Sequence, residues 1–326
     1  MTEGLVHAYF QLTGRCNLHC RFCGQSKGML GTERKELSPE IWLDAAEQLK
    51  HYADGSGKLP SIQLWGGEPL LYPEFDRIAY ALHEQGFPLE MVTNGTLLHL
   101  HRDAVAECID RIYVSVDGPG KIHDSVRGEG TFRILRDNLK LLKNRRGKLI
   151  FLTTVSDLNV ASLSRLPFEL AELGPDQIVL SQLMYLFRKD IDSYREYSRT
   201  HFGCDYPELE AWLRDDDTEY IETLRRETEI VARTGYPVTV CFTPHAWKDH
   251  PDAKPCDAPF KRVHIRHDGE VGFCTDYFGF SAGNILKDSL ENIFRGKRAE
   301  AFRKAVSENA LSTCQHCAWR IQKISE

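Results

Sequence analysis

Three cysteines near the N-terminus have the spacing C-x3-C-x2-C, which suits redox chemistry. They are Cys16, Cys20 and Cys23, and no other cysteine follows within the next eighty residues. Three thiolates can hold a 4Fe-4S cluster and leave one iron without a protein ligand, whereas an electron-transfer cluster is usually closed by four cysteines. The spacing therefore predicts a cluster whose open iron binds a substrate or a cofactor.

Two other uses of these thiols stay open at this point. His19 could complete a zinc site, although structural zinc sites favour C-x2-C pairs. A disulfide agrees less well with a sequence that opens with no basic-then-apolar signal segment and has the composition of a large cytosolic domain. We therefore expect reduced thiols and a cytoplasmic protein.

The composition limits the fold and the partners. With 326 residues, 42% of them hydrophobic and 10% aromatic, the chain can bury one large core or two smaller ones without disulfides. No run of about 18 apolar residues occurs, which argues against a transmembrane helix. A formal net charge of -6 argues against a general affinity for nucleic-acid phosphates. We expect neither a membrane nor a nucleic acid as a partner.

Short apolar, β-branched runs alternate with helical periodicity along most of the chain. The six runs predicted to be strands are 5–13, 61–67, 88–95, 111–118, 148–155 and 177–186. Helices between such strands indicate right-handed parallel crossovers. The sequence predicts an α/β fold, a partial (β/α)6 TIM-like barrel, with its chemistry at the carboxyl ends of the strands.

The regular alternation ends near residue 235. Residues 187–230 are charged, have helical periodicity and are expected to form a variable helical insertion. Four prolines between 244 and 259 then predict loop-dominated structure. We expect a core barrel over 1–235 and a small loop-rich domain over 236–326.

The cysteine loop and two other loops resemble the motifs of radical SAM enzymes. They are CNLHCRFC, GGEP (66–69) and SVD (115–117), in order at matching strand ends, and the resemblance covers about the first 235 residues. It implies that the open iron binds the amino and carboxylate groups of S-adenosylmethionine (SAM). It also implies reductive cleavage of SAM to a 5′-deoxyadenosyl radical, hydrogen abstraction from a substrate, and an external one-electron reductant such as flavodoxin or ferredoxin.

The resemblance implies roles for residues of the first two motifs. Phe22 is expected to pack near the adenine, with simple cover of the cluster as the alternative. Gly66 and Gly67 let the backbone approach the methionine end of SAM closely. Glu68 is expected near the ammonium group of the same moiety.

The third motif and the segment after it supply three more candidates. Ser115 and Asp117 lie on one face of a predicted strand, where they can bond the ribose hydroxyls or the methionine moiety. Asp117 could instead cap the turn at Gly118 and Pro119. Arg127 resembles an arginine that related enzymes place against the methionine carboxylate, which suits a guanidinium fork.

A second set of cysteines lies in the C-terminal part of the chain. It comprises Cys256, Cys274, Cys314 and Cys317. Four thiolates can close one zinc site or one cluster, and paired cysteines alone favour zinc. The surrounding pattern, with DG-x3-FC and C-x2-C, is similar to the SPASM/twitch extension of radical SAM enzymes. Because the full SPASM form has about seven cysteines, the four here imply the twitch-like form with one auxiliary 4Fe-4S cluster.

Three cysteines lie outside both sets. Cys108 is predicted to be a small buried hydrophobe. Cys204 and Cys241 are of interest because radical SAM epimerases use a thiol to return a hydrogen atom to a substrate radical. Free cysteines are more often buried and inert. Of the two, Cys241 is our candidate hydrogen donor.

The resemblance defines the type of reaction more closely than it defines the substrate. Members with auxiliary clusters commonly crosslink, epimerise or oxidise a ribosomally made peptide or a protein side chain, and we expect this function. The first strand begins by about residue 5, so we expect a separate peptide-recognition protein or capture of the peptide by 187–230. The alternatives are an oxidase or epimerase of a small polar metabolite, such as a sugar or aminoglycoside, and a non-catalytic iron-sulfur protein. The intact GGEP and SVD loops argue against the last.

Overall fold

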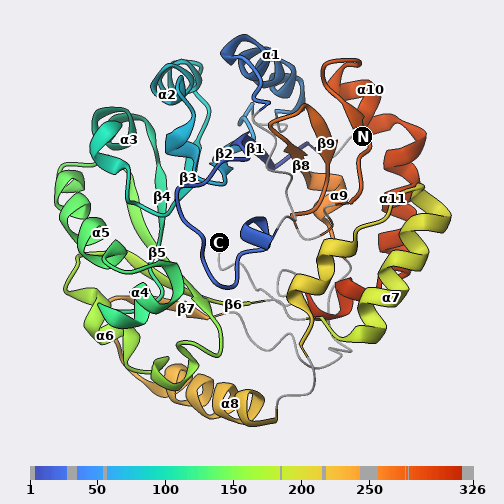
Figure 1. The fold of residues 1–326 in the computed structure, drawn as a ribbon. Coiled ribbons are helices and arrows are strands. Elements are labelled where there is room, and N and C mark those ends of the chain that lie inside the picture. The colour runs from blue at the N-terminus through green and yellow to red at the C-terminus, as the bar shows by residue number, and fades with distance from the viewer. Residues whose placement is uncertain are drawn as a thin grey trace.

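The computed structural model describes residues 4–27, 35–53, 57–183, 186–214, 218–242, 256–275, 277 and 279–317. Its strands form one open sheet in the order β10-β9-β8-β1-β2-β3-β4-β5-β6-β7. The pairing is parallel from β8 through to β7, and β9 and β10 add antiparallel pairs beyond β8. Figure 1 shows the strands curving around the centre of the molecule with helices on the outside. The predicted α/β fold with a partial, open barrel is confirmed.

The strands are β1 His7–Thr13, β2 Ser61–Gly66, β3 Leu89–Thr93, β4 Arg111–Ser115, β5 Lys148–Val155, β6 Gln177–Gln182, β7 Thr239–Phe242, β8 Arg262–Ile265, β9 Glu270–Gly272 and β10 Gly283–Asn284. The α-helices are α1 Pro39–Leu49, α2 Phe75–Glu84, α3 Arg102–Cys108, α4 Lys121–Arg127, α5 Thr131–Leu139, α6 Leu166–Ala171, α7 Arg188–Tyr197, α8 Thr218–Arg233, α9 Ala258–Lys261, α10 Leu290–Arg295 and α11 Lys297–Ser307. Short 3-10 turns include η1 Gln25–Lys27, η3 Pro69–Leu71, η8 Pro207–Trp212 and η9 Ser312–His316.

Two parallel strands were not among the six expected. β7 pairs with β6, and β8 pairs with β1, so both edges of the barrel wall extend further than the sequence indicated. Each is only four residues long, which is too short for a periodicity signal. Most of the proline-rich segment expected to be loop, 243–255, lies outside the described residues.

Successive side chains along each strand alternate between the outer core, under the helices, and the interior of the barrel. In β1, Ala8, Phe10 and Leu12 are fully buried, and the Phe10 ring lies 4.9 Å from that of Trp42 in α1. The intervening side chains of β1 project to the opposite face, because successive residues of a strand alternate. This second face lines the inside of the barrel and carries polar groups.

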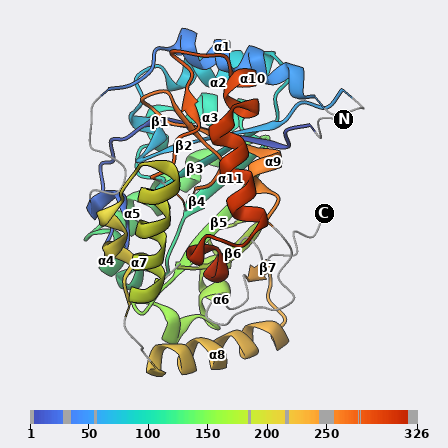
Figure 2. The same cartoon turned by 90° about the vertical axis from the view of Figure 1, so that its right-hand side faces the viewer.

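The C-terminal segment is joined to the barrel by more than sheet pairing. His264 of β8 stacks on Tyr9 of β1 with 4.0 Å between ring centroids. The backbone N–H of Leu290, at the start of α10, donates to Oε1 of Gln48 in α1 over 2.7 Å. Figure 2 shows α7, α10 and α11 on the side of the molecule that faces the viewer.

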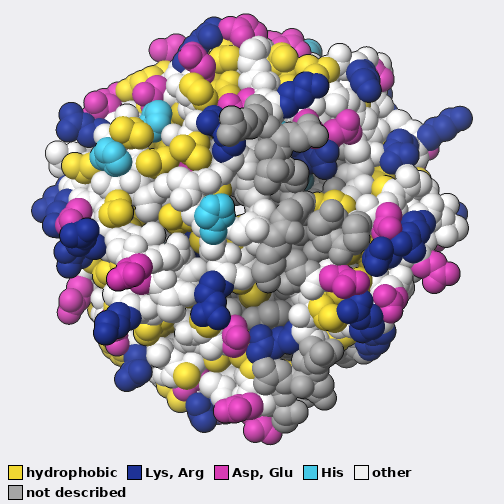
Figure 3. All heavy atoms as spheres, in the orientation of Figure 1, with side chains coloured by type: hydrophobic (Ala, Val, Ile, Leu, Met, Phe, Trp, Pro, Cys, Tyr) yellow, Lys and Arg dark blue, Asp and Glu magenta, His cyan; other side chains and the backbone are white. Residues whose placement is uncertain are grey.

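The surface in Figure 3 mixes charges of both signs around the rim of the visible face. In the parts of the chain that the structure describes, no helix is long and apolar enough to cross a membrane.

The boundary expected near residue 235 stays a prediction, and truncation tests it. A fragment 1–235 lacks β7 and β8, so both β6 and β1 lose a hydrogen-bonded neighbour. We expect this fragment to melt at a clearly lower temperature than the full chain in a circular-dichroism scan. A fragment 1–242, which restores β7, is the matched control. Melting of both fragments at the full-length temperature would show that the barrel does not depend on β8.

Candidate functional site

A cavity of about 220 Å³ opens at the carboxyl ends of the first four strands. Its described lining includes eight of the predicted site residues: Cys16, Cys20, Cys23, Phe22, Gly66, Gly67, Ser115 and Arg127. Two predicted residues, Glu68 and Asp117, are fully buried and lie outside this lining. The structure therefore brings the three motifs together at one rim and places two carboxylates behind the wall.

The cysteine loop leaves β1 and is held by backbone contacts to its neighbours. The N–H of Cys23 donates to the carbonyl of Cys20 over 3.1 Å, which closes a tight turn. The N–H of Arg21 donates to the carbonyl of Val126 in α4 over 3.0 Å. The loop is thus fixed both to itself and to the helix that carries Arg127.

The thiols of this loop fit an iron-sulfur cluster by their chemistry. Burial raises the pKa of Cys20 to about 11 and also raises that of Cys16, so thiolates form there only with a compensating cation. Among the residues described, no three Cys, His, Asp or Glu side chains are grouped as ligands of one metal ion. A cluster does not require such a group, because each cysteine binds its own iron.

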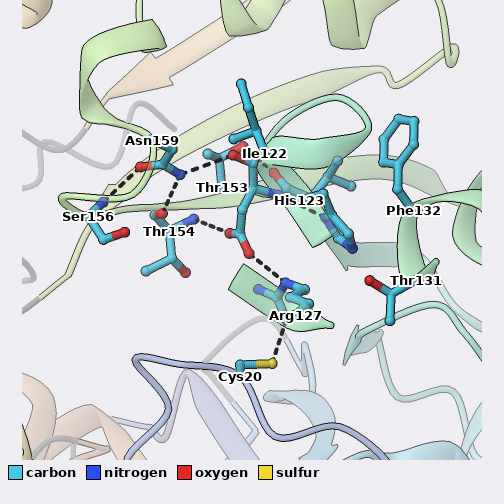
Figure 4. Close-up of polar contacts among 12 residues, drawn as sticks. Cys20, Ile122, His123, Arg127, Thr131, Phe132, Thr153, Thr154, Ser156 and Asn159 are labelled. Atoms are coloured by element: carbon cyan, nitrogen blue, oxygen red, sulfur yellow. Dashed lines mark hydrogen bonds and ion pairs between the residues drawn. The ribbon is translucent and has the colours of Figure 1, made fainter. Parts of the chain in front are cut away.

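Arg127 connects the cysteine loop to the fourth strand, as Figure 4 shows. Its Nε donates to Asp117 Oδ2 over 2.6 Å, and its Nη1 lies 3.8 Å from Cys20 Sγ. The guanidinium also lies 5.7 Å from the ring of Phe22. Burial opposes the charge, but Asp117 and the neighbouring thiols more than offset it, and the pKa of Arg127 is raised. The arginine therefore stays charged beside the thiols.

Asp117 is occupied by protein donors. Besides Arg127, its carboxylate accepts from the backbone N–H of Thr154 over 3.0 Å. The side chain of Asn159 donates to the carbonyl of Asp117 over 3.0 Å. Neither contact is the predicted turn cap, because the carboxylate points to β5 and α4 instead. Asp117 positions Arg127, and direct contact with SAM stays a prediction.

Glu68 ties the second strand to the third. Its carboxylate accepts from Thr93 Oγ1 over 2.6 Å, from the N–H of Asn94 over 2.8 Å and from that of Leu70 over 3.2 Å. Burial raises the pKa of Glu68 to about 7 despite these donors. The expected contact with the SAM ammonium is not tested, and the structure adds a positioning role for the residue.

Gly66 and Gly67 allow the GGEP loop to touch the cysteine loop. A Cβ at Gly66 would overlap the carbonyl oxygen of Thr13, and one at Gly67 would overlap that of Arg15. The backbone N–H groups of Gly67 and Glu68 donate to those two carbonyls over 2.9 and 2.8 Å. The close approach in the structure is thus between two loops, and both glycines also line the cavity.

The loop after the third strand, TNG at 93–95, contains no predicted site residue. Asn94 Nδ2 donates to Asn17 Oδ1 over 2.9 Å, while Asn94 Oδ1 accepts from Thr96. This amide joins the third strand to the cysteine loop. Four further lining residues, Gln25, Ser26, Trp65 and Trp212, were missed because they belong to no motif. Trp212 comes from η8 of the insertion and was not distinguishable there from other exposed aromatics.

The second cysteine set borders the core of the C-terminal part. Cys256, Cys274 and Cys314 are partly buried against the core, and Cys317 is buried. The rings of Tyr194 and Tyr277 lie 4.1 Å apart beside these thiols. Burial raises the pKa of both tyrosines, and Cys274 contributes at Tyr194 and Cys314 at Tyr277. The donor set fits an auxiliary cluster.

The remaining cysteines have separate surroundings. Cys108 is fully buried in α3. Cys204 donates to the carbonyl of Ser198 over 3.9 Å and, like Cys314, contributes to the raised pKa of Tyr277. Cys241 accepts a hydrogen bond from Gln177 Nε2 over 2.8 Å and is opposite Val179 in the sheet register. Its role as a hydrogen donor stays a prediction.

Replacing Glu68 by glutamine is expected to change how stability depends on pH. The carboxyl loses its proton near pH 4.5 when unfolded and near pH 7 when folded, so folding takes up a proton between these values. The free energy of unfolding should therefore fall by about 3 kcal/mol as pH rises through this window. In Glu68→Gln this fall should be absent, as measured by urea denaturation of apoprotein. Glu47→Gln, in an exposed ion pair, is the control. An unchanged slope in Glu68→Gln would contradict the assignment.

The Gly67→Ala substitution is expected to weaken SAM binding at least tenfold. The added methyl cannot fit against the Arg15 carbonyl, so the GGEP and cysteine loops must separate. Isothermal titration of cluster-loaded protein with SAM measures the effect. Gly235→Ala is the matched control, because nothing lies within 4 Å of its Cβ position. Equal affinities for the two variants would show that the loop contact is not needed.

Comparison with known proteins agrees with the geometry. Residues 10–165 match the Radical SAM superfamily, and residues 256–318 match the SPASM iron-sulfur cluster-binding domain. The AdoMet-dependent heme synthase of Methanosarcina barkeri is 31% identical over 332 residues, covering 95% of this chain and 88% of that protein.

Other relatives share less of their length with this chain. The pre-heme d1 synthase of Dinoroseobacter shibae is 30% identical, and the match covers 60% of this chain and 48% of the length of that protein. The subtilosin biosynthesis protein AlbA of Bacillus subtilis is 25% identical, and the match covers 96% of this chain and 64% of the length of that protein. The chain thus spans less than two thirds of these two relatives.

Solved structures show the same fold. Streptococcus suis SuiB bound to S-adenosylmethionine has a TM-score of 0.68 at 14% identity, covering 96% of this chain and 72% of SuiB. This likeness concerns the fold, and the two family matches assign the cofactors: SAM, a 4Fe-4S cluster and auxiliary iron-sulfur. The chain belongs to the radical SAM superfamily and is a SAM-dependent enzyme with a C-terminal SPASM domain.

Proposed function

We propose that this enzyme abstracts a hydrogen atom from a ribosomally made peptide or a protein side chain and thereby crosslinks, epimerises or oxidises it. The observation that carries the proposal is that three motifs line one cavity, in a chain whose relatives include peptide-maturation proteins. Of the described lining residues, only Arg127 bears a fixed charge, and that charge is paired with Asp117. Besides the three thiols, the polar lining consists mainly of carboxamides and hydroxyls, which suit the uncharged amides of a peptide.

Named relatives support a peptide substrate. AlbA is described as a bacteriocin biosynthesis protein, and SkfB of Bacillus subtilis, 28% identical over 52% of this chain, as a sporulation killing factor maturation protein. SuiB has been solved with its precursor peptide SuiA. These names describe the relatives, and they are the reason to test peptides first.

The proposed roles follow from the positions of the side chains. Cys16, Cys20 and Cys23 would hold the catalytic cluster, which when bound supplies the electron for reductive cleavage of SAM. Arg127, fixed by Asp117, keeps positive charge beside these thiolates and presents its remaining N–H groups to the cavity. Phe22 and Ser115 complete the wall for the cofactor.

The C-terminal cysteines and outside partners complete the proposal. Cys256, Cys274, Cys314 and Cys317 would hold one auxiliary 4Fe-4S cluster. An external one-electron donor, flavodoxin or ferredoxin, would reduce the catalytic cluster. A separate recognition protein or the 187–230 insertion would present the peptide, and the insertion already reaches the cavity at Trp212.

A tetrapyrrole is the second candidate substrate, and a specific comparison favours it. The full-length relative with 31% identity is a heme synthase. Porphyrin carboxylates require cationic partners, because an unpaired buried charge is costly. The described lining offers one cation, and Asp117 already pairs with it. We therefore rank a porphyrin below a peptide, together with other small polar metabolites.

Iron analysis of anaerobically reconstituted protein tests the two clusters. We expect about eight irons in the wild type and about four in each of two variants, Cys16/Cys20/Cys23→Ala and Cys256/Cys274/Cys314/Cys317→Ala. Only the first variant should lose 5′-deoxyadenosine formation from SAM and dithionite outright. Zinc in the wild type that disappears only in the second variant would remove the auxiliary cluster from the proposal.

Substrate-dependent turnover separates the two candidate functions. The wild type is incubated with SAM, dithionite and either any short peptide encoded beside its gene or a carboxylate-bearing porphyrin. A mass change in a peptide with stoichiometric 5′-deoxyadenosine is the expected result. A product from the porphyrin alone would overturn the peptide proposal in favour of the second candidate.

A further inference from the structure

On the inner face of β8, β1 and β2, several buried polar atoms have no hydrogen-bond partner in the part of the chain that the structure describes. They are His7 Nε2, Gln11 Nε2, Gln11 Oε1, Trp65 Nε1 and His264 Nδ1. Buried polar groups are rarely left unpaired, because each has lost its bonds to water without replacement. Such a group of atoms on three adjacent strands calls for a ligand that supplies the missing partners.

Gln11 is the centre of this group. Its side chain is 1% exposed, and neither atom of its amide has a partner. Gln11 is opposite Trp65 in the β1–β2 register, so the two side chains share the inner face. Trp65 also lines the cavity that holds the three cysteines. The free amide therefore lies beside a residue of the cavity wall.

His264 brings the C-terminal part into the same wall. Its ring stacks on Tyr9 and meets Trp65 edge-on, with 6.4 Å between centroids. Burial holds the pKa of His264 well below its usual value, so the ring is neutral and has one N–H donor and one acceptor. Burial also raises the pKa of Tyr9 to about 12, with a contribution from Cys274. The wall thus extends from the catalytic loop toward the second cysteine set.

We propose that Gln11 and His264 form a substrate subsite that binds an amide group of the peptide, next to Trp65 in the wall of the cavity. The inference rests on the proposed function and names the part of the substrate that the barrel binds. A primary amide presents a donor and an acceptor side by side, and another amide is its direct complement. The neutral imidazole adds one further partner, and the rings of Tyr9 and Trp65 suit the flat, uncharged amide plane.

The subsite would hold the substrate between the two cysteine sets. Gln11 is on the strand that ends in the cysteine loop, and His264 is on the strand that leads toward Cys274. A peptide bound here by its backbone leaves its side chains free to reach the cavity. The subsite would then recognise the peptide backbone, and the cavity would select the side chain that reacts.

Stability and binding of one variant test the subsite together. Gln11→Leu removes the unpaired amide at nearly constant volume. We expect its melting temperature, in cluster-loaded full-length protein, to rise by about 2 °C or more because an unsatisfied group is lost. The same variant should retain about tenfold less of a library of N-acetylated, C-amidated hexapeptides in an affinity selection read by mass spectrometry. SAM affinity should not change.

Two further variants keep the test decisive. His264→Phe preserves the stacking on Tyr9 but removes both ring nitrogens, and it should also weaken peptide retention. Gln85→Leu is the matched control, because Gln85 follows α2 outside the barrel and its Oε1 is likewise unpaired. It should gain stability without losing peptides. If Gln11→Leu fails to fold, Gln11→Met replaces it.

The outcomes distinguish the subsite from the function on which it rests. Equal retention of peptides by wild type and Gln11→Leu overturns the subsite while peptide modification stands. A lower melting temperature for Gln11→Leu also overturns it, since the amide would then have a structural partner such as a bound water. If the wild type retains no peptide but modifies one in the turnover assay, the subsite is overturned and the proposed function stands; if it neither retains nor modifies a peptide, both fail.

Discussion

The parallel pairing of β1 with β2 on one side and β8 on the other is the constraint on which the rest of this molecule depends. The end of β1 carries the cysteine loop, and its register with β2 sets the GGEP loop against that loop. Its register with β8 brings His264 into contact with Tyr9. A shift of one residue in either pairing would exchange the inner and outer faces of β1. It would move Phe10 out of the core as well as Gln11 out of the barrel.

Charge is distributed with a clear division between the wall and the layer behind it. The buried carboxylates of Asp117 and Glu68 are saturated by protein donors, and each holds a loop in place. Apart from Arg127 and the three thiols, the polar and aromatic part of the described cavity wall consists of amides, hydroxyls and aromatic rings. Such a wall stabilises a charged cofactor at one defined point and otherwise leaves a radical among groups with little electrostatic preference. The charged residues Asp117 and Glu68 of the motifs therefore act by holding neighbouring groups in position.

Much of the fold and of the site could be predicted from the sequence because the information is local. Alternation and helical periodicity give β1 to β6 and most of the helices between them, and three cysteines within eight residues define their loop. The pairing of β8 with β1 could not be predicted, since each strand is short and they are far apart in the chain. Gln11 was missed for a related reason. Only the register shows that it faces the interior, and only the three-dimensional structure shows that its amide lacks a partner.

The β1–β8 pairing also has a consequence for how the chain is made. His7 and Arg262 are partners in the sheet although about 250 residues separate them. During synthesis the open edge of β1 therefore waits until almost the whole barrel has left the ribosome, and an unpaired parallel edge is a template for aggregation. Contacts of such high sequence separation form slowly. The cysteine loop at the end of β1 is therefore made long before the strand that completes the wall beside it.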